Sequence, residues 1–376
     1  MNDPLLRYKI ALEMIPHIGS ITAKKLIAYC GGVDEVFNQS KRSLLKIPGV
    51  GEFIAYQVNH QKVLERAEQE IEFMERYGIG TLYYTDHDYP ERLKQCDDSP
   101  ILLYYKGERC LSYPKVLSVV GTRNATDYGK GLCSEIVSAL ASRGHQLLVV
   151  SGLAHGIDTA AHRAALKSNL PTVGVLAHGL NMIYPAANRN LAKEMLASGA
   201  LVTDFITGTE PERNNFLRRN RIIAGLADAT LIVESGQKGG ALVTAELAFS
   251  YNRDVLSCPG RAGDRYSQGC NALIKSNKAA LVETAEDIEN ALNWQVKVPK
   301  QEQSQQLSMF RSLNPDEEKI VTLLKMVERE SIDTISSISG LSMPATSALL
   351  LAMEFDGIVK SLPGKTYSLV KSYVKQ

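Results

Sequence analysis

Strands and helices alternate through the middle of this 376-residue chain. Short apolar runs rich in Val, Leu and Ile end at small residues or glycines, and a helical pattern follows each run. The first two such units occupy residues 115–162. Parallel strands require a crossover connection and must be covered on both faces, so this alternation predicts an α/β domain with a Rossmann-like parallel sheet.

Six segments are predicted as strands of this sheet. They are residues 116–120, 145–150, 171–177, 200–204, 229–234 and 254–258. In an open parallel sheet, ligands bind beyond the carboxyl ends of the strands. We therefore expect the functional residues in the turns that follow these segments.

The N-terminal part, residues 1–76, is predicted to be an all-helical, SAM-like domain. Within it, residues 15–26 and 47–55 each place a tight turn before a helix that begins near a glycine. Both segments resemble helix-hairpin-helix motifs, in which the turn and the helix N-terminus hold a DNA phosphate. A helical bundle that binds nothing fits the same pattern. Residues 77–113 are predicted to be a connector or an extension of the core domain, which itself spans residues 114–295.

A polar, Gln-rich linker is predicted at residues 296–314. Within it, the peptide from Gln306 to Phe310 resembles the short motif by which bacterial proteins dock on the replicative sliding clamp. Residues 315–376 are predicted to form a winged-helix domain of three helices and a hairpin. The expected recognition helix, residues 343–355, has no Lys or Arg, so protein contact or a structural role is favoured over groove reading.

The formal net charge is only +1, so nucleic-acid binding requires a local basic patch. The six cysteines form no CxxC pair and no zinc spacing, which is typical of reduced thiols in a cytoplasm. The N-terminus has no signal-peptide pattern, and no apolar run approaches the roughly 20 residues of a membrane span. A cytoplasmic protein without a membrane partner is predicted.

Residues suited to binding phosphate gather at the expected strand ends. Guanidinium groups give bidentate phosphate contacts, and an aromatic ring among them offers a face on which a base stacks, worth about 1–3 kcal/mol. The alternative is a protein surface on which these arginines form ion pairs with Glu210 and Glu212. The predicted DNA-binding residues are Gly121, Thr122, Arg123, Ser151, Gly152, Phe216, Arg218, Arg219, Asn220, Arg221, Lys238, Gly239 and Gly240, with the triplet 219–221 expected to open a helix.

Several catalytic motifs are missing from the sequence. There is no GxGxxG after the first strand, no Walker A lysine motif and no GxSxG elbow. His155, Asp158 and His162 have a spacing that a metal site could use, but helix capping or packing explains them more simply. No catalytic residue, metal or cofactor is therefore predicted.

The motifs of the core resemble those of the DNA-processing protein A family (DprA, also called Smf). The segments that carry the resemblance are 119–123, 126–129, 151–158 with 161–162, 184–185, 219–226, 242–245, and 259–260 with 269–271. They occur in order across most of residues 116–275. The helical head and the winged-helix tail match the fullest architecture of the family.

The resemblance implies a non-enzymatic protein that binds single-stranded DNA. It implies that the protein protects incoming DNA during natural transformation, loads the RecA recombinase onto it, and works as a homodimer through the Rossmann-like domain. Arg123 corresponds to the DNA-binding arginine of the family, and residues 219–221 correspond to its basic triplet. The chain departs from the family at Phe216-Leu217, Thr203-Asp204 and Gly239-Gly240, where Phe-Pro, Ser-Glu and Ser-Gly are usual.

Two other functions remain open on the sequence. A phosphoribohydrolase of the lysine-decarboxylase-like type uses a glycine pair followed by Thr and Glu, a pattern that Gly239-Gly240, Thr244 and Glu246 approach with one residue too many. A transcription-type regulator would act through the winged helix and bind duplex DNA.

Overall fold

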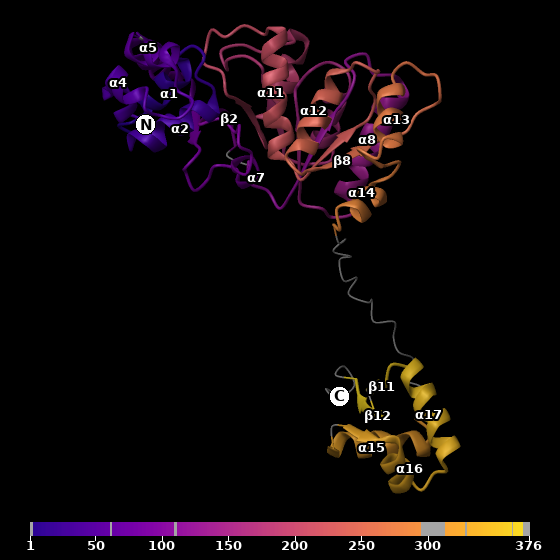
Figure 1. The fold of residues 1–376 in the computed structure, drawn as a ribbon. Helices are drawn as coiled ribbons and strands as arrows, with labels where there is room; N and C mark the ends of the chain where they lie inside the picture. The colour runs from indigo at the N-terminus through magenta and orange to yellow at the C-terminus, as the bar shows by residue number, and fades with distance from the viewer. Residues whose placement is uncertain are drawn as a thin grey trace. The chain divides into compact units, whose positions relative to one another are not determined.

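The computed structural model describes residues 3–60, 62–108, 111–294, 313–327, 329–362 and 364–370. The chain forms two compact units, Met1–Pro299 and Lys300–Gln376 (Figure 1). The first unit contains the helical head, the connector and the α/β core. The second contains the C-terminal helices and hairpin.

A nine-stranded sheet runs through the first unit in the order β1-β2-β6-β5-β4-β3-β7-β8-β9. The seven strands from β6 to β9 are parallel, which confirms the predicted core sheet, while β1 and β2 extend one edge in antiparallel pairing. All six predicted strands are present. The bounds are β1 Gly80–Tyr83, β2 Leu102–Gly107, β3 Lys115–Val120, β4 Leu147–Ser151, β5 Thr172–Val175, β6 Ala200–Thr203, β7 Ala229–Ile232, β8 Asp254–Ser257 and β9 Ala280–Leu281.

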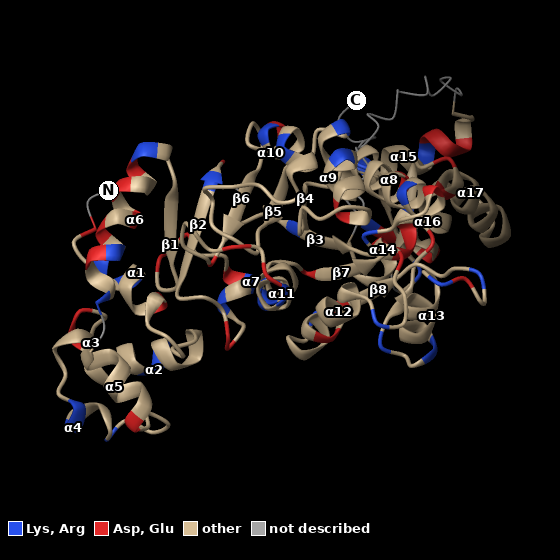
Figure 2. Ribbon diagram, turned by 90° about the horizontal axis from the view of Figure 1, so that it is seen from above, with Lys and Arg blue, Asp and Glu red and all other residues tan. Residues whose placement is uncertain are grey.

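Helices cover both faces of this sheet (Figure 2). On one face lie α8 (Asp127–Ser142), α9 (Ile157–Lys167), α10 (Arg189–Met195) and α14 (Ala285–Ala291). On the other lie α7 (Glu91–Lys94), α11 (Arg213–Leu226), α12 (Gly240–Ser250) and α13 (Gln268–Lys275).

Successive side chains of a strand point to opposite faces, so each face has its own apolar layer. In β3, Val116 and Val120 pack toward α11, whereas Leu117 and Val119 pack toward α8. Burial on both sides explains why these strands are almost continuously apolar.

The chain reverses its direction across the sheet at β3. From β3 it proceeds outward through β4, β5 and β6, and then crosses back to place β7 on the other side of β3. The turns after β3 and β7 therefore flank a topological switch point, where open α/β sheets bind their ligands.

The N-terminal head is all-helical, as predicted. Its helices are α1 (Leu6–Met14), α2 (Ser20–Cys30), α3 (Glu35–Asn38), α4 (Lys41–Leu44), α5 (Glu52–His60) and α6 (Val63–Tyr77). In the two predicted hairpin segments, α2 begins directly after Gly19 and α5 directly after Gly51. Residues of the head share one apolar core with Ile101, Leu102 and Tyr104 of the connector, so the head packs against the edge of the sheet.

The second unit is a winged helix, as predicted. It contains α15 (Pro315–Val327), β10 (Arg329–Ser331), α16 (Ile332–Ser339), α17 (Met343–Phe355), β11 (Val359–Leu362) and β12 (Thr366–Leu369). The strands form an antiparallel sheet in the order β10-β12-β11, of which the sequence predicted only the hairpin. The predicted clamp-binding peptide, residues 306–310, lies outside the described residues.

Within the described residues, no single helix has both the length and the apolar character needed to cross a bilayer. The helices α16 and α17 satisfy that test only when taken together, as a pair bent by 111°.

Candidate nucleic-acid interface

The turn after β3 is held tightly against its neighbours. The Thr122 amide donates a hydrogen bond to the Glu234 carbonyl (2.7 Å), and the Ile157 amide donates to the Thr122 carbonyl (3.2 Å). A Cβ atom at Gly121 would collide with Ile157, and one at Gly156, where φ is +77°, would collide with the Thr122 carbonyl. Both positions therefore require glycine, and the turn has little freedom to move.

A buried carboxylate anchors the helix that follows this turn. Glu234, two residues after the end of β7, accepts hydrogen bonds from the Thr126 amide (2.9 Å) and the Thr126 hydroxyl (2.5 Å). Thr126 in turn caps α8 by accepting from the Gly129 amide (3.1 Å). The turns after β3 and β7 are thus joined, and Arg123 projects from a rigid base.

The Arg123 side chain is exposed and lies over an aromatic ring. Its guanidinium carbon is 4.8 Å from the centroid of the Phe216 ring, which is a cation–π contact. The Tyr184 ring lies 5.9 Å from the same Phe216 ring. Among the described residues, no ion pair involves Arg123. The structure therefore brings a cation and an aromatic side chain together at the switch point, although they are 93 positions apart in the sequence (216 − 123).

The basic triplet does not open a helix, contrary to the sequence-based expectation. The helix α11 begins at Arg213, so the triplet lies in its middle. Positions 219 to 226 of α11 are all buried, because this half of the helix packs between the sheet and its neighbouring helices. As a result Arg219, Asn220 and Arg221 are only 4%, 9% and 8% exposed.

Arg219 holds the turn after β4 from the inside. Its Nη1 donates to the Gly152 carbonyl (2.8 Å) and also to the Val175 carbonyl. Burial lowers the pKa of Arg219 to about 10, although the nearby Asp158 carboxylate opposes that change. The guanidinium occupies the space that a Cβ at Gly152 would need. In this structure Arg219 therefore supports the turn after β4 from below it.

Two other residues at the turn after β4, Ser151 and Asp158, are also buried. The Ser151 hydroxyl donates to the Val119 carbonyl (2.6 Å). Asp158 accepts from the amides of Gly152 (3.1 Å) and Ala154 (3.3 Å), and burial raises its pKa. This matches the packing explanation for Asp158.

His162 is buried and has a packing role. Its Nδ1 lies 2.7 Å from the Thr172 hydroxyl, and burial lowers its pKa to about 3, so it is neutral. Within the part of the chain that the structure describes, no cluster of three or more His, Cys, Asp or Glu side chains is placed to hold a metal ion. His155 is exposed and lies outside this packed group.

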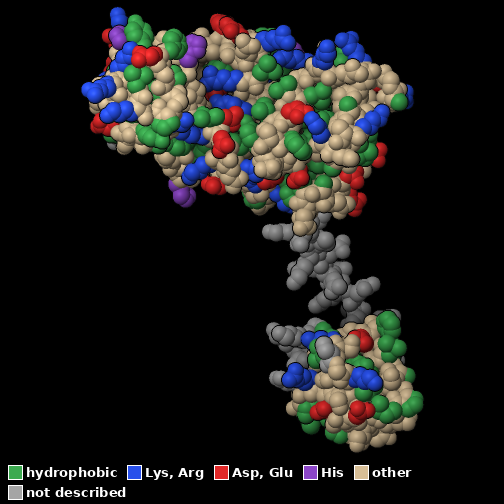
Figure 3. All heavy atoms as spheres, in the orientation of Figure 1, with side chains coloured by type: hydrophobic (Ala, Val, Ile, Leu, Met, Phe, Trp, Pro, Cys, Tyr) green, Lys and Arg blue, Asp and Glu red, His purple; other side chains and the backbone are tan. Residues whose placement is uncertain are grey.

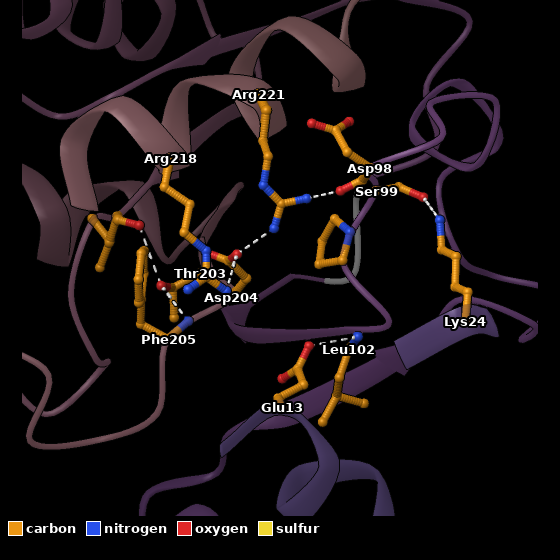
Figure 4. Close-up of polar contacts among 12 residues, drawn as sticks. Glu13, Lys24, Asp98, Ser99, Leu102, Thr203, Asp204, Phe205, Arg218 and Arg221 are labelled. Carbon is orange, nitrogen blue, oxygen red and sulfur yellow. Dashed lines mark hydrogen bonds and ion pairs between the residues drawn. The ribbon is translucent and has the colours of Figure 1, made fainter. Parts of the chain in front are cut away.

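Arg218 and Arg221 share a carboxylate at the junction of the head and the core (Figure 4). Arg221 Nη2 lies 2.5 Å from Asp204 Oδ2, and Arg218 Nη2 lies 3.4 Å from the same atom. Arg221 also donates to the Asp98 carbonyl. Their partner is Asp204, and not Glu210 or Glu212 as the alternative pairing required. Arg218 nevertheless keeps a side chain that is 49% exposed.

The same junction brings the head close to α11. Lys24 of α2 donates to the Ser99 hydroxyl (2.7 Å), and Glu13 of α1 accepts from the Leu102 amide (3.1 Å), as Figure 4 shows. A pocket of about 330 Å³ lies between the start of α2 and the pair Arg218 and Arg221. Figure 3 shows Lys and Arg side chains gathered where the head meets the core.

The loop after β7 contributes Lys238 to the same edge of the sheet. Lys238 is exposed, Gly239 is the N-cap residue of α12, and Gly240 is its first residue. A Cβ at Gly239 would collide with the Ser235 hydroxyl, which explains the glycine there. The predicted residues thus divide into exposed groups, namely Arg123, Arg218 and Lys238, and buried groups that shape the turns.

The structure does not assemble the pattern of the phosphoribohydrolase alternative. Glu246 is exposed on α12 and pairs with Lys278 (2.8 Å), just before β9 at the amino end of the sheet. Thr244 is buried within the same helix. The carboxylate that this alternative needs therefore points away from the switch point.

Sequence reasoning overlooked the anchoring role of Glu234 and the partner role of Asp204. Both follow a buried strand, which was the available signal, but the search at strand ends favoured cations and glycines. It also overlooked basic residues on α8 and α9, because these lie within helices and not in the turns.

Comparison with known proteins agrees with these features. The family model "DNA recombination-mediator protein A" matches residues 80–293, and the model "DprA winged helix domain" matches residues 308–365. The Smf protein of Synechocystis is 31% identical over 395 residues, covering 96% of this chain and 98% of the relative. The Smf protein of Escherichia coli is 35% identical and covers 73% of this chain and 74% of the relative.

Two solved structures are also similar. DNA processing protein A from Streptococcus pneumoniae superposes with a TM-score of 0.65 at 30% identity, covering 75% of this chain and 95% of that one. DNA processing protein A from Helicobacter pylori, described for its single-stranded DNA binding mode, has a TM-score of 0.52 at 28% identity and covers 58% of this chain and 96% of that one. The core, the winged helix and the near full-length relative together show that this chain belongs to the DprA/Smf family of DNA recombination-mediator proteins.

Proposed function

We propose that this chain binds single-stranded DNA at the carboxyl edge of the core sheet, and that it does so as a binding protein and not as an enzyme. The observation that carries the proposal is the exposed Arg123 guanidinium on the Phe216 ring at the switch point. A guanidinium suits a backbone phosphate, and the ring suits a base.

The arrangement favours a single strand over a duplex. A base stacks on Phe216 only when its own faces are free, which they are not inside a double helix. Phosphate contacts of this kind position the strand without reading sequence. The Helicobacter pylori relative with a described single-stranded binding mode supports the same conclusion.

The wider role proposed is that of a recombination mediator. The chain would protect incoming single strands during natural transformation in the cytoplasm and load RecA onto them, acting as a homodimer. Membership in a recombination-mediator family supports this role.

Docking of residues 306–310 on the sliding clamp remains a separate hypothesis. A linker peptide that binds the clamp, and loses binding on Leu307→Ala plus Phe310→Ala, would support it.

The central test compares single-stranded and duplex DNA binding across a salt series. Arg123→Ala should weaken single-strand binding by about 10-fold or more, the loss expected for a charge-assisted hydrogen bond. It should also reduce the slope of log affinity against log salt by about 0.7, the value for one lost phosphate contact. Arg76→Ala, which removes an exposed arginine from α6, is the matched control.

Equal binding by wild type and Arg123→Ala would remove the proposed site. The enzyme alternative is checked in parallel by incubation with AMP. No release of adenine is expected, and release that Glu246→Ala abolishes would favour the phosphoribohydrolase.

A further inference from the structure

A basic hollow lies on the other face of the sheet from α11. It is about 460 Å³ in volume and is formed by α8, by α9 with the turn before it, and by the short 3₁₀ helix η1 (Ala186–Asn188). Among the described residues that line it, there is no Asp or Glu. Four of its lining residues are basic, namely Lys130, His155, Arg163 and Lys167.

The protein does little to neutralise the charge of this hollow. Arg163 and Lys167 are both exposed and stand four residues apart on α9, where like charges destabilise a helix by about 0.2–0.5 kcal/mol. In the described portion of the chain, no ion pair joins either of them to a carboxylate. Lys130 pairs with Asp127, a fully exposed residue one turn earlier (3.1 Å), and with no other carboxylate among the residues that the structure describes. The hollow is therefore suited to an anion from outside the protein.

The hollow is continuous with the edge that carries Arg123. Gly156 lines it, and the same glycine packs so closely against the carbonyls of Thr122 and Arg123 that a Cβ would collide with both. Asn188 also lines it, and its side chain donates to the carbonyls of Leu153 (2.9 Å) and Ala154 (3.4 Å) in the turn after β4. The hollow thus begins beside the turns that follow β3 and β4.

The two sides of this edge differ in what they offer a strand of DNA. The α11 side has Phe216 and Tyr184, which provide rings for stacking. The α8–α9 side has long cationic side chains, and apart from the imidazole of His155 its lining includes no aromatic ring. Figure 2 shows that α8 and α9 cover one face of the sheet and α11 the other. A strand that passes Arg123 must cross from one face to the other to reach both.

We propose that bound single-stranded DNA crosses the edge of the sheet at Arg123 and continues into the α8–α9 hollow. There Lys130, Arg163 and Lys167 neutralise successive backbone phosphates without reading the bases. This inference rests on the proposed function and extends it, because it adds a second contact surface on the same strand. The inference predicts that the affinity of the protein for single-stranded DNA depends on the length of the strand.

The test uses the full-length chain and oligothymidylates of graded length, with binding followed by fluorescence anisotropy across a salt series. The double variant Arg163→Ala/Lys167→Ala should bind long oligomers about 5- to 20-fold more weakly, and its salt slope should fall by about 1.4, twice the value for one phosphate. The shortest oligomer that wild type binds should be held equally well by the variant.

The control variant is Lys94→Ala/Lys275→Ala. It removes the same charge from the amino edge of the sheet, at the ends of α7 and α13, where both lysines are exposed. Its binding should match wild type at every length. Urea unfolding of both double variants checks that neither loses stability, and relief of the like-charge pair should leave Arg163→Ala/Lys167→Ala at least as stable as wild type.

The outcomes separate this inference from the proposed function. If Arg123→Ala weakens binding at all lengths while Arg163→Ala/Lys167→Ala behaves like its control, the strand leaves the edge elsewhere and only the further inference fails. Equal loss on the shortest and longest oligomers would also overturn it, because the hollow would then belong to the primary site. If wild type binds no single-stranded DNA, both proposals fail.

Discussion

The first and second halves of α11 use the same kind of residue for different purposes. In the second half, Arg219 and Arg221 are buried and bind carbonyl and carboxylate oxygens of the protein. In the first half, Phe216 contacts Arg123, and Arg218 keeps a side chain that is 49% exposed although it lies 3.4 Å from Asp204. Arginines that look equivalent in a basic segment therefore divide into buried residues that hold the structure and exposed residues that a ligand can reach.

This difference matters for interpreting mutations. Removal of a buried guanidinium leaves carbonyl groups and a carboxylate without their partner, so its main effect is a loss of stability. Removal of an exposed guanidinium costs little stability and changes ligand binding directly. Loss of DNA binding in a variant of the basic segment has a different meaning in each half of the helix.

The largest effect is expected for Arg219→Ala. The change should lower the free energy of unfolding of the first unit by about 3–5 kcal/mol, because Asp158 and the carbonyls of Gly152 and Val175 lose a buried cation. Urea denaturation measures it. Arg218→Ala, at the adjacent exposed position, is the control and should cost less than about 1 kcal/mol. A stable Arg219→Ala protein that nevertheless loses DNA binding would place Arg219 in contact with DNA and break the comparison.

Phe216→Ala tests the first half of α11. Loss of one base–aromatic stack, worth about 1–3 kcal/mol, should weaken single-strand binding by about 5- to 150-fold. The salt slope should stay near that of wild type, since no charge is removed. Phe249→Ala on α12, which removes another exposed aromatic ring, provides the control. A steeply reduced salt slope in Phe216→Ala would instead mean that the ring only holds Arg123 in place.

Glu13 extends the comparison to the junction of head and core. The Oε2 of this carboxyl group is buried and has no hydrogen-bond partner among the described residues, and burial together with Asp204 raises the pKa of Glu13 well above the usual range. Glu13→Gln should therefore stabilise the protein at neutral pH by about 1–3 kcal/mol, because the neutral amide avoids the desolvation cost that the buried carboxyl group meets on ionisation.

The pH dependence gives the Glu13 prediction its sign. Because the folded-state pKa is the higher one, the folded protein retains the proton while the unfolded chain loses it, and stability falls as pH rises above the unfolded value of about 4.3. The gain from Glu13→Gln should thus be absent below about pH 4 and present at pH 7. Denaturation at both pH values measures it, and an equal gain at both would show that ionisation is not the cause.

The smallest effect is expected from removing the second unit, Lys300–Gln376. Its helix α17 has no Lys or Arg and exposes Met343, Leu351 and Phe355. Because phosphate binding depends on cations and α17 has none, single-strand affinity should change by no more than about twofold. A loss of tenfold or more would show that the winged helix shares in DNA binding, and it would remove the contrast between the cations of the core and a helix α17 that has none.

Much of the fold follows from local patterns in the sequence. Alternation of apolar runs with helical periodicity specifies the parallel sheet, and the strands of the core lie where the pattern placed them because burial on both faces demands continuous apolar stretches. The turns after β3 and β4 were found for the same reason, since glycines mark positions where backbone segments meet closely. Arg123 was placed at the carboxyl edge of the sheet because the end of a parallel strand is a local feature.

The roles of the individual cations depend on contacts between distant parts of the chain. Whether Arg219 faces the solvent or the Gly152 carbonyl is decided by how α11 packs on the sheet, 67 residues away from that carbonyl. The basic hollow arises only because α8 and α9 lie side by side and bring Lys130 near Arg163 and Lys167. The periodicity of apolar residues shows which side of a helix or strand is apolar. The packing of one element against another then decides which charged side chains are buried and which charges lie near them, and so gives each charge its function.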